Sequence, residues 1–219
     1  TSHPKVAKVA FTGGEGAGRK IMKNASADFK RLTLELGGKS AQIVFPDADL
    51  AAAVSGGIAG IFAATGQTCI AGSRLLVHES IYDAYLERFV TSAKTAQMGD
   101  PMELTTQVGP VTTQPQFDRI LSYIDIAKKE GARCALGGSP AVRPECGNGW
   151  FIEPTVFADV RNNMRIAQEE VFGPVVSVIP FSEDEEAYAI ANDTEYGLAA
   201  GVWTSSIKRA TVAPRRLRA

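Results

Sequence analysis

Apolar residues follow two different spacings along this chain, one typical of strands and the other of helices. Residues 31–36 carry leucine at every second position, which predicts a half-buried strand. Residues 81–97 and 114–130 repeat apolar residues every three or four positions, which predicts amphipathic helices. Further strands are predicted at 6–12, 41–45, 74–78, 133–136, 175–181 and 201–204, and further helices at 19–27, 50–64, 184–191 and from 206 onward. This alternation favours an α/β fold with a parallel sheet and helices on both faces.

Glycine and proline mark the connections. Residues 13–18 contain four glycines between a predicted strand and a predicted helix. Such a turn can direct backbone N–H groups at a phosphate, although it is more often only a tight connection. The glycine- and proline-rich residues 137–149 predict an exposed loop. Pro214 falls inside the last predicted helix, where it removes a hydrogen bond and predicts a kink or an irregularity.

Composition argues against several kinds of partner. The chain has 219 residues, of which 45% are hydrophobic and 21% charged, as is usual for a globular protein. A net charge of −1 gives no basis for binding nucleic acid or an anionic membrane, and no apolar run is long enough to span a bilayer. The three cysteines show no metal-ligand spacing and fit a reducing compartment. We therefore expect a cytoplasmic enzyme without a metal site.

Cys69 is the candidate nucleophile. It lies between a predicted apolar helix and a predicted strand, in the sequence Gly66-Gln67-Thr68-Cys69. Small and polar neighbours at such a junction can hold a thiolate rigid and partly exposed. The alternative is a small buried hydrophobe, which is the usual state of a free cysteine. A carboxylate, Glu35, lies on the polar face of the strand at 31–36 and strengthens the catalytic interpretation.

Two motifs together identify a family. The sequence Leu34-Glu35-Leu36-Gly37-Gly38-Lys39 is followed by Gly66-Gln67-Thr68-Cys69, with Cys69 34 positions after Glu35. These two motifs at this spacing resemble the NAD(P)-dependent aldehyde dehydrogenases. The resemblance covers essentially the whole chain. It implies that residues 1–37 are the last part of a Rossmann-like cofactor domain and that residues 38–219 are most of a parallel-sheet catalytic domain. On this view the chain is an internal fragment, incomplete at both ends.

The resemblance also implies roles for individual residues. Cys69 would attack the aldehyde, and Glu35 would activate the water that hydrolyses the resulting thioester. Glu35 also favours hydrolysis over transfer to coenzyme A, since the branch that uses coenzyme A generally lacks this glutamate. Glu170 would bind the two nicotinamide-side ribose hydroxyls of the cofactor, since a carboxylate can accept two hydrogen bonds. The cofactor-binding residues would be Gly13, Gly14, Gly18, Leu36, Glu170 and Phe172, with Gly14 standing where a serine is usual, and the substrate pocket would include Thr68 and Ile70.

The expected function is oxidation of an aldehyde to a carboxylic acid with NAD or NADP. One alternative is a truncated or degenerate chain that only packs or associates. Another is a cysteine hydrolase that uses Cys69 and Glu35 without a cofactor, although a hydrolase needs neither the glycine turn nor the Glu170 segment. The expected partner is a small-molecule aldehyde, and the family implies a homodimeric or homotetrameric parent.

Overall fold

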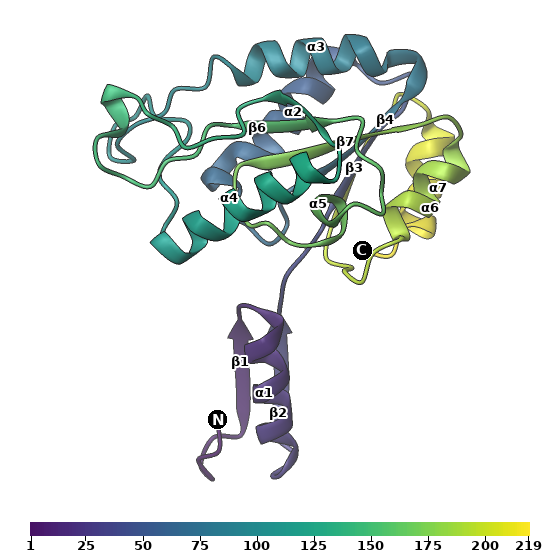
Figure 1. The fold of residues 1–219 in the computed structure, drawn as a ribbon. Helices are drawn as coiled ribbons and strands as arrows, with labels where there is room; N and C mark the ends of the chain where they lie inside the picture. Colours follow the sequence, from purple (N-terminus) through teal and green to yellow (C-terminus); the bar gives the residue numbers. More distant parts are fainter. The chain divides into compact units, whose positions relative to one another are not determined.

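The computed structural model describes residues 1–219 and divides into two compact units, residues 1–38 and residues 39–219. The first unit has a two-stranded parallel sheet of β1 (Lys8–Thr12) and β2 (Arg31–Glu35), connected by helix α1 (Glu15–Ser26) (Figure 1). The second unit has a six-stranded sheet and six α-helices, α2 to α7, whose bounds are given below. None of the helices combines the length and the apolar character needed to cross a bilayer.

Helix α1 begins earlier than the sequence predicts. The glycine-rich residues were expected to form a turn with a helix from residue 19, but the helix starts at Glu15 and contains Gly16 and Gly18. Gly18 is buried, and a Cβ atom there would lie 2.8 Å from Cδ2 of Leu36. The absence of a side chain at Gly18 therefore allows the helix to pack against Leu36, which follows β2. The sequence pattern alone does not distinguish a glycine that packs in a helix from a glycine that forms a turn.

The sheet of the second unit has the strand order β5-β6-β7-β4-β3-β8. All neighbouring strands are parallel except β5 and β6, which are antiparallel. The expectation of a parallel sheet therefore fails at this edge, because residues 137–154 connect β5 to β6 without the crossover helix that parallel strands require. The elements are β3 (Ala41–Val44), α2 (Leu50–Phe62), β4 (Arg74–His78), α3 (Tyr82–Ala93), α4 (Gln114–Lys129), β5 (Arg133–Leu136), β6 (Thr155–Ala158), α5 (Arg165–Gln168), β7 (Val175–Phe181), α6 (Asp184–Asn192), β8 (Ala200–Trp203) and α7 (Ile207–Arg216).

Helices cover both faces of this sheet, as the apolar strand sequences predict (Figure 1). On β4, Leu75 and Val77 pack with α2 and α3, whereas Leu76 packs with residues of α4, α5, α6 and α7. All three side chains are fully buried. Because both faces of these parallel strands are buried, their sequences are continuous apolar runs.

Several predicted boundaries differ from the structure. Helix α2 ends at Phe62, and a 3₁₀ turn at 63–66 replaces its expected last residues. Helix α3 ends at Ala93 instead of residue 97. Helix α7 continues through Pro214 to Arg216, because the carbonyl that loses its bond belongs to Ala210, which is exposed and accessible to water. Cys146, in the loop predicted to be exposed, is buried.

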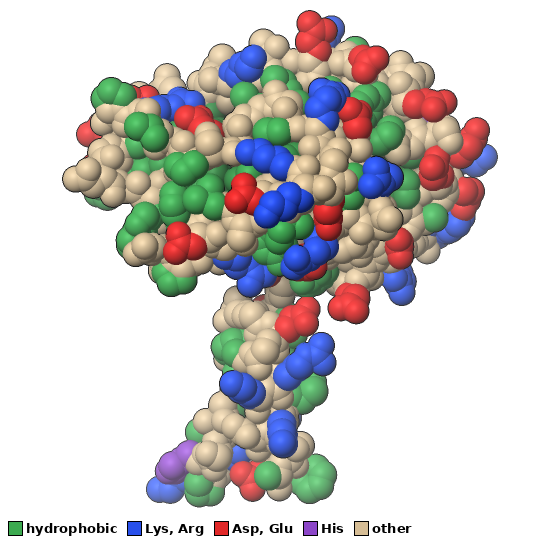
Figure 2. All heavy atoms as spheres, viewed as in Figure 1, with side chains coloured by type: hydrophobic (Ala, Val, Ile, Leu, Met, Phe, Trp, Pro, Cys, Tyr) green, Lys and Arg blue, Asp and Glu red, His purple; other side chains and the backbone are tan.

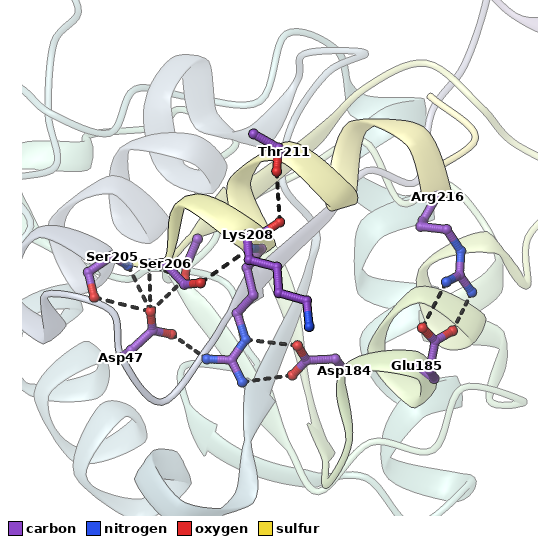
Figure 3. Close-up of polar contacts among 10 residues, drawn as sticks. Asp47, Asp184, Glu185, Ser205, Ser206, Lys208, Thr211 and Arg216 are labelled. Atoms are coloured by element: carbon purple, nitrogen blue, oxygen red, sulfur yellow. Dashed lines mark hydrogen bonds and ion pairs between the residues drawn. The ribbon is translucent and has the colours of Figure 1, made fainter.

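Helix α7 is held to the sheet by charged side chains (Figure 3). Asp47, which follows β3, accepts hydrogen bonds from Thr204 Oγ1 at 2.7 Å and from the Ser206 N–H at 2.8 Å. Arg209 donates to Asp47 at 2.6 Å and to both carboxylate oxygens of Asp184 at 2.8 and 2.9 Å. Desolvation would raise the pKa of Asp47, but the hydrogen bonds outweigh it and hold the pKa well below its usual range. The start of α7 is thereby fixed beside β3.

Candidate active site

Cys69 lies in a loop whose backbone is constrained on both sides. Ala64 and Thr65, in the 3₁₀ turn that follows α2, have left-handed φ angles of 49° and 57°, and Gly66 has a φ of 66°. Non-glycine residues in this region carry strain that the surrounding structure must offset. After the cysteine, the Ala71 N–H donates to the carbonyl of Thr68 at 3.0 Å and closes a turn around it. Cys69 itself is a free, half-buried cysteine, so it is not sealed inside the core.

Side chains on this loop attach it to the segment that precedes α4. Thr65 Oγ1 donates to the carbonyl of Gly109 at 3.1 Å. Gln67 Oε1 accepts from both the N–H and the hydroxyl of Thr112, at 3.0 and 2.8 Å. The two contacts lie on either side of Gly66 and hold the loop against residues 109–112.

The loop also lies directly against the segment that contains Glu170 and Phe172. A Cβ atom at Gly66 would lie 2.0 Å from the carbonyl oxygen of Gly173, a distance that only glycine permits. Glu170 and Phe172 are half-buried, and Phe172 has a left-handed φ of 59°. The structure therefore brings together, within one unit, two motifs that lie about a hundred residues apart in the sequence.

Thr68 and Ile70 line a common cavity of about 350 Å³. Ile70 is 58% exposed, and Thr68 is half-buried. Cys69 lies between them in the sequence but is not part of the cavity wall. Ser40 and Gln42 also line this cavity, and the buried Ser40 hydroxyl has no hydrogen-bond partner in the protein.

Two buried cations near the loop were not assigned a role from the sequence. Arg74 is 1% exposed and donates to the carbonyls of Lys39, Ile190 and Ala191 at 2.9, 2.9 and 2.7 Å. Burial lowers its pKa to about 10. Lys39 is 2% exposed, and burial, assisted by repulsion from Arg74, lowers its pKa to about 7 against the opposing effect of Glu170. The sequence does carry a signal for Arg74, because an arginine at the first position of an otherwise apolar strand indicates a buried charge that needs hydrogen-bond partners.

In the first unit, Glu35 and the glycine turn lie at the same end of the two-stranded sheet. Glu35 ends β2 opposite Thr12, its side chain is exposed, and its carbonyl accepts the Gly13 N–H at 3.0 Å. Gly14 precedes α1 without a side-chain cap, and space is open beside Gly14 and Gly16. An uncapped helix start with unhindered backbone N–H groups fits a phosphate.

The predicted site residues thus fall into two groups. Gly13, Gly14, Gly18, Glu35 and Leu36 lie in the first unit, and Thr68, Cys69, Ile70, Glu170 and Phe172 lie in the second. In the first unit, Gly18 packs against Leu36 and Gly13 is hydrogen-bonded to Glu35, and in the second unit the two loops meet at Gly66 and Gly173. The pairing of Glu35 with Cys69 connects the two units and stays a prediction.

Comparison with known proteins places this arrangement in a family. Residues 1–219 match the model of the aldehyde dehydrogenase family. A betaine aldehyde dehydrogenase from Brucella ovis is 48% identical over 208 residues, which are 95% of this chain and 43% of that protein. Two solved structures, PnpE from Pseudomonas sp. WBC-3 and an NAD+ complex of betaine aldehyde dehydrogenase from Staphylococcus aureus, are 48% and 42% identical, with TM-scores of 0.97 and 0.96. They cover 100% and 99% of this chain, which spans 45% and 43% of theirs, less than half their length.

Proposed function

The chain belongs to the aldehyde dehydrogenase family, and we propose that the protein carrying it oxidises an aldehyde to a carboxylic acid with NAD or NADP. The observation that carries this proposal is the contact between Gly66 and Gly173. It holds the half-exposed Cys69 loop against the turn that contains Glu170 and Phe172. A nucleophile fixed beside candidate cofactor-binding residues is the arrangement that hydride removal requires.

In the first step, the Cys69 thiolate attacks the aldehyde carbon. A carbon–sulfur bond forms, and the carbonyl oxygen becomes an oxyanion. The N–H of Cys69 makes no hydrogen bond within the protein, so it is available to donate to this oxyanion. Collapse of the oxyanion re-forms the carbonyl, expels a hydride from the same carbon and leaves a thioester on Cys69. NAD(P)+, when bound, would supply the hydride acceptor.

In the second step, Glu35 removes a proton from water, and the resulting hydroxide attacks the thioester carbon. The carbon–sulfur bond breaks, which releases the carboxylic acid and restores the Cys69 thiolate. The exposed carboxylate of Glu35 at the end of β2 supports this role, because a general base must reach solvent water.

Residues of both units would hold the cofactor. We assign the pyrophosphate to the uncapped start of α1 and to Gly13, Gly14 and Gly18, with Leu36 beside the helix. We assign the nicotinamide-side ribose to Glu170 and the ring contact to Phe172. On this proposal, residues 1–37 are part of a cofactor domain, and residues 38–219 are catalytic. PnpE and the Staphylococcus aureus enzyme have both been solved in complex with NAD, which supports the choice of cofactor class.

The substrate is an aldehyde small enough to approach Cys69 beside the cavity of Thr68 and Ile70. Because relatives are named betaine aldehyde dehydrogenases, betaine aldehyde belongs among the first compounds to test. Short aliphatic and aromatic aldehydes test whether the apolar Ile70 side favours a substrate without charge.

The test is formation of reduced nicotinamide by the full-length protein that carries this chain. We expect turnover with NAD+ or NADP+ and at least one aldehyde of the panel, and loss of that turnover in Cys69→Ala. Cys134→Ala is the matched control, because Cys134 is also half-buried but lies on β5. Absence of reduced nicotinamide with every aldehyde would favour a chain that only packs or associates. Ester hydrolysis without nucleotide would favour a hydrolase.

A further inference from the structure

One face of helix α4 reaches the turn at 169–172 with polar side chains. Gln116 Nε2 donates to the carbonyl oxygens of Val171 and Phe172, each at 2.9 Å. Arg119 donates to the carbonyl of Glu170 at 3.0 Å. The structure gives the carbonyls of Val171 and Phe172 no other backbone donor, so the Gln116 amide holds both of them.

The same face makes a third contact one turn further along. The hydroxyl of Tyr123 donates to the Glu169 carboxylate at 2.7 Å, and Tyr123 is only 7% exposed. Arg165 donates to the same carboxylate at 2.6 and 2.9 Å. The hydrogen bonds from Arg165, which outweigh desolvation, lower the pKa of Glu169 to about 2, so that this acceptor is ionised at neutral pH.

Between these polar residues, the helix packs closely against the end of the turn. A Cβ atom at Gly173 would lie 2.4 Å from Cδ1 of Ile120. Residues 116, 119, 120 and 123 share one helix face because of the spacing of the α-helix. Gly173 therefore has Ile120 on one side and Gly66 of the Cys69 loop close to its carbonyl oxygen.

The turn needs such support because its backbone is strained. Phe172 has a φ of 59°, a left-handed conformation that is unfavourable for a bulky residue. The hydrogen bonds from Gln116 to the carbonyls of Val171 and Phe172 favour this backbone conformation over others. The side-chain directions of Glu170 and Phe172 depend on the backbone that these bonds fix.

We infer that helix α4 is the positioning element of the cofactor-binding turn, and that Gln116, Arg119 and Tyr123 fix residues 169–172 in the conformation that binds the dinucleotide. The inference rests on the proposed function, because it assumes that Glu170 and Phe172 meet the cofactor. It assigns these three residues no contact with the reacting atoms. They act through the turn.

The test compares Gln116→Leu with Gln114→Leu in the full-length protein. The first variant removes the amide donor at nearly constant size, whereas Gln114 is exposed on the same helix and makes no side-chain hydrogen bond. We expect Gln116→Leu to raise the KM for the dinucleotide about tenfold, as for loss of roughly 1.4 kcal/mol, with a smaller change in KM for the aldehyde. Gln116→Lys keeps a donor of similar reach and should restore part of the affinity.

A double-mutant cycle with Glu170→Gln separates positioning from general loss of structure. If Gln116 acts through the turn, Gln116→Leu should change the KM for the dinucleotide much less when Glu170 is already altered. Equal effects in both backgrounds, or equal KM values for the Gln116→Leu and Gln114→Leu proteins, would overturn the inference. A parent protein that forms no reduced nicotinamide would instead overturn the proposed function, so the two failures are distinguishable.

Discussion

The carbonyl oxygen of Gly173 lies where a side chain at Gly66 would have to be placed, 2.0 Å from an ideal Cβ. The contact joins the loop of the candidate nucleophile to the turn of the candidate cofactor-binding residues. Because both partners are backbone atoms, neither can yield by a change of rotamer. The relative position of the two segments is therefore set by main-chain packing.

Replacing Gly66 by alanine should distort this contact. The new Cβ would clash with the Gly173 carbonyl, and a φ of 66° is unfavourable for alanine. We expect loss of stability of order 1–3 kcal/mol and at least a tenfold loss of kcat/KM, measured by urea unfolding and by steady-state turnover. Gly131→Ala is the control, because Gly131 also has a positive φ but has open space around it. Equal losses of activity in the two variants would contradict the packing argument.

Arg74 should contribute strongly to stability. Arg74→Met leaves the carbonyls of Lys39, Ile190 and Ala191 without their donor, and each buried unpaired acceptor costs about 1–3 kcal/mol. We expect the free energy of unfolding to fall by about 3 kcal/mol or more. Arg88→Met should change it by less than about 0.5 kcal/mol, since Arg88 is exposed on α3. A loss no greater than that of the Arg88 variant would show that the buried hydrogen bonds are dispensable.

Lys39 should make stability depend on pH. Its folded pKa of about 7 lies below the ordinary value of 10.5, so between these values the unfolded chain binds a proton that the folded protein does not. The free energy of unfolding contributed by Lys39 should therefore rise with pH from about 7 to 10.5, by at most about 1.4 kcal/mol per pH unit. Denaturant unfolding at a series of pH values should show that Lys39→Met removes this rise. Parallel pH profiles for the two proteins would refute the assignment.

Much of the second unit could be predicted from the sequence. The apolar run at 175–181 predicts a strand and is β7, and Asp49, a residue type favoured at helix starts, caps α2 by accepting the Ala52 N–H at 3.0 Å. A buried strand and an aspartate at a helix start both depend on local pattern, which a single sequence displays. The antiparallel edge at β5 depends instead on the path of residues 137–154, which no local periodicity reports.

The sequence predicts the candidate catalytic and cofactor-binding residues, but not the residues that hold them in position. Cys69 and Glu170 belong to short motifs, whereas Gln116 lies in an amphipathic helix that the pattern describes only as a core element. Its role depends on carbonyls more than fifty residues away. Hydrogen bonds to backbone carbonyls are independent of the partner's side chain, and so they leave no sequence signature.

The central claim is that Cys69 forms a thioester and that Glu35 activates the water that hydrolyses it. Mass spectrometry of Glu35→Gln protein, mixed with an oxidised dinucleotide and an aldehyde, tests both parts in one experiment. We expect one equivalent of reduced nicotinamide in a rapid phase, slow turnover afterwards, and an acyl group that accumulates on the peptide containing Cys69. Unchanged steady-state turnover with no acyl group on Cys69 would contradict the roles of both residues.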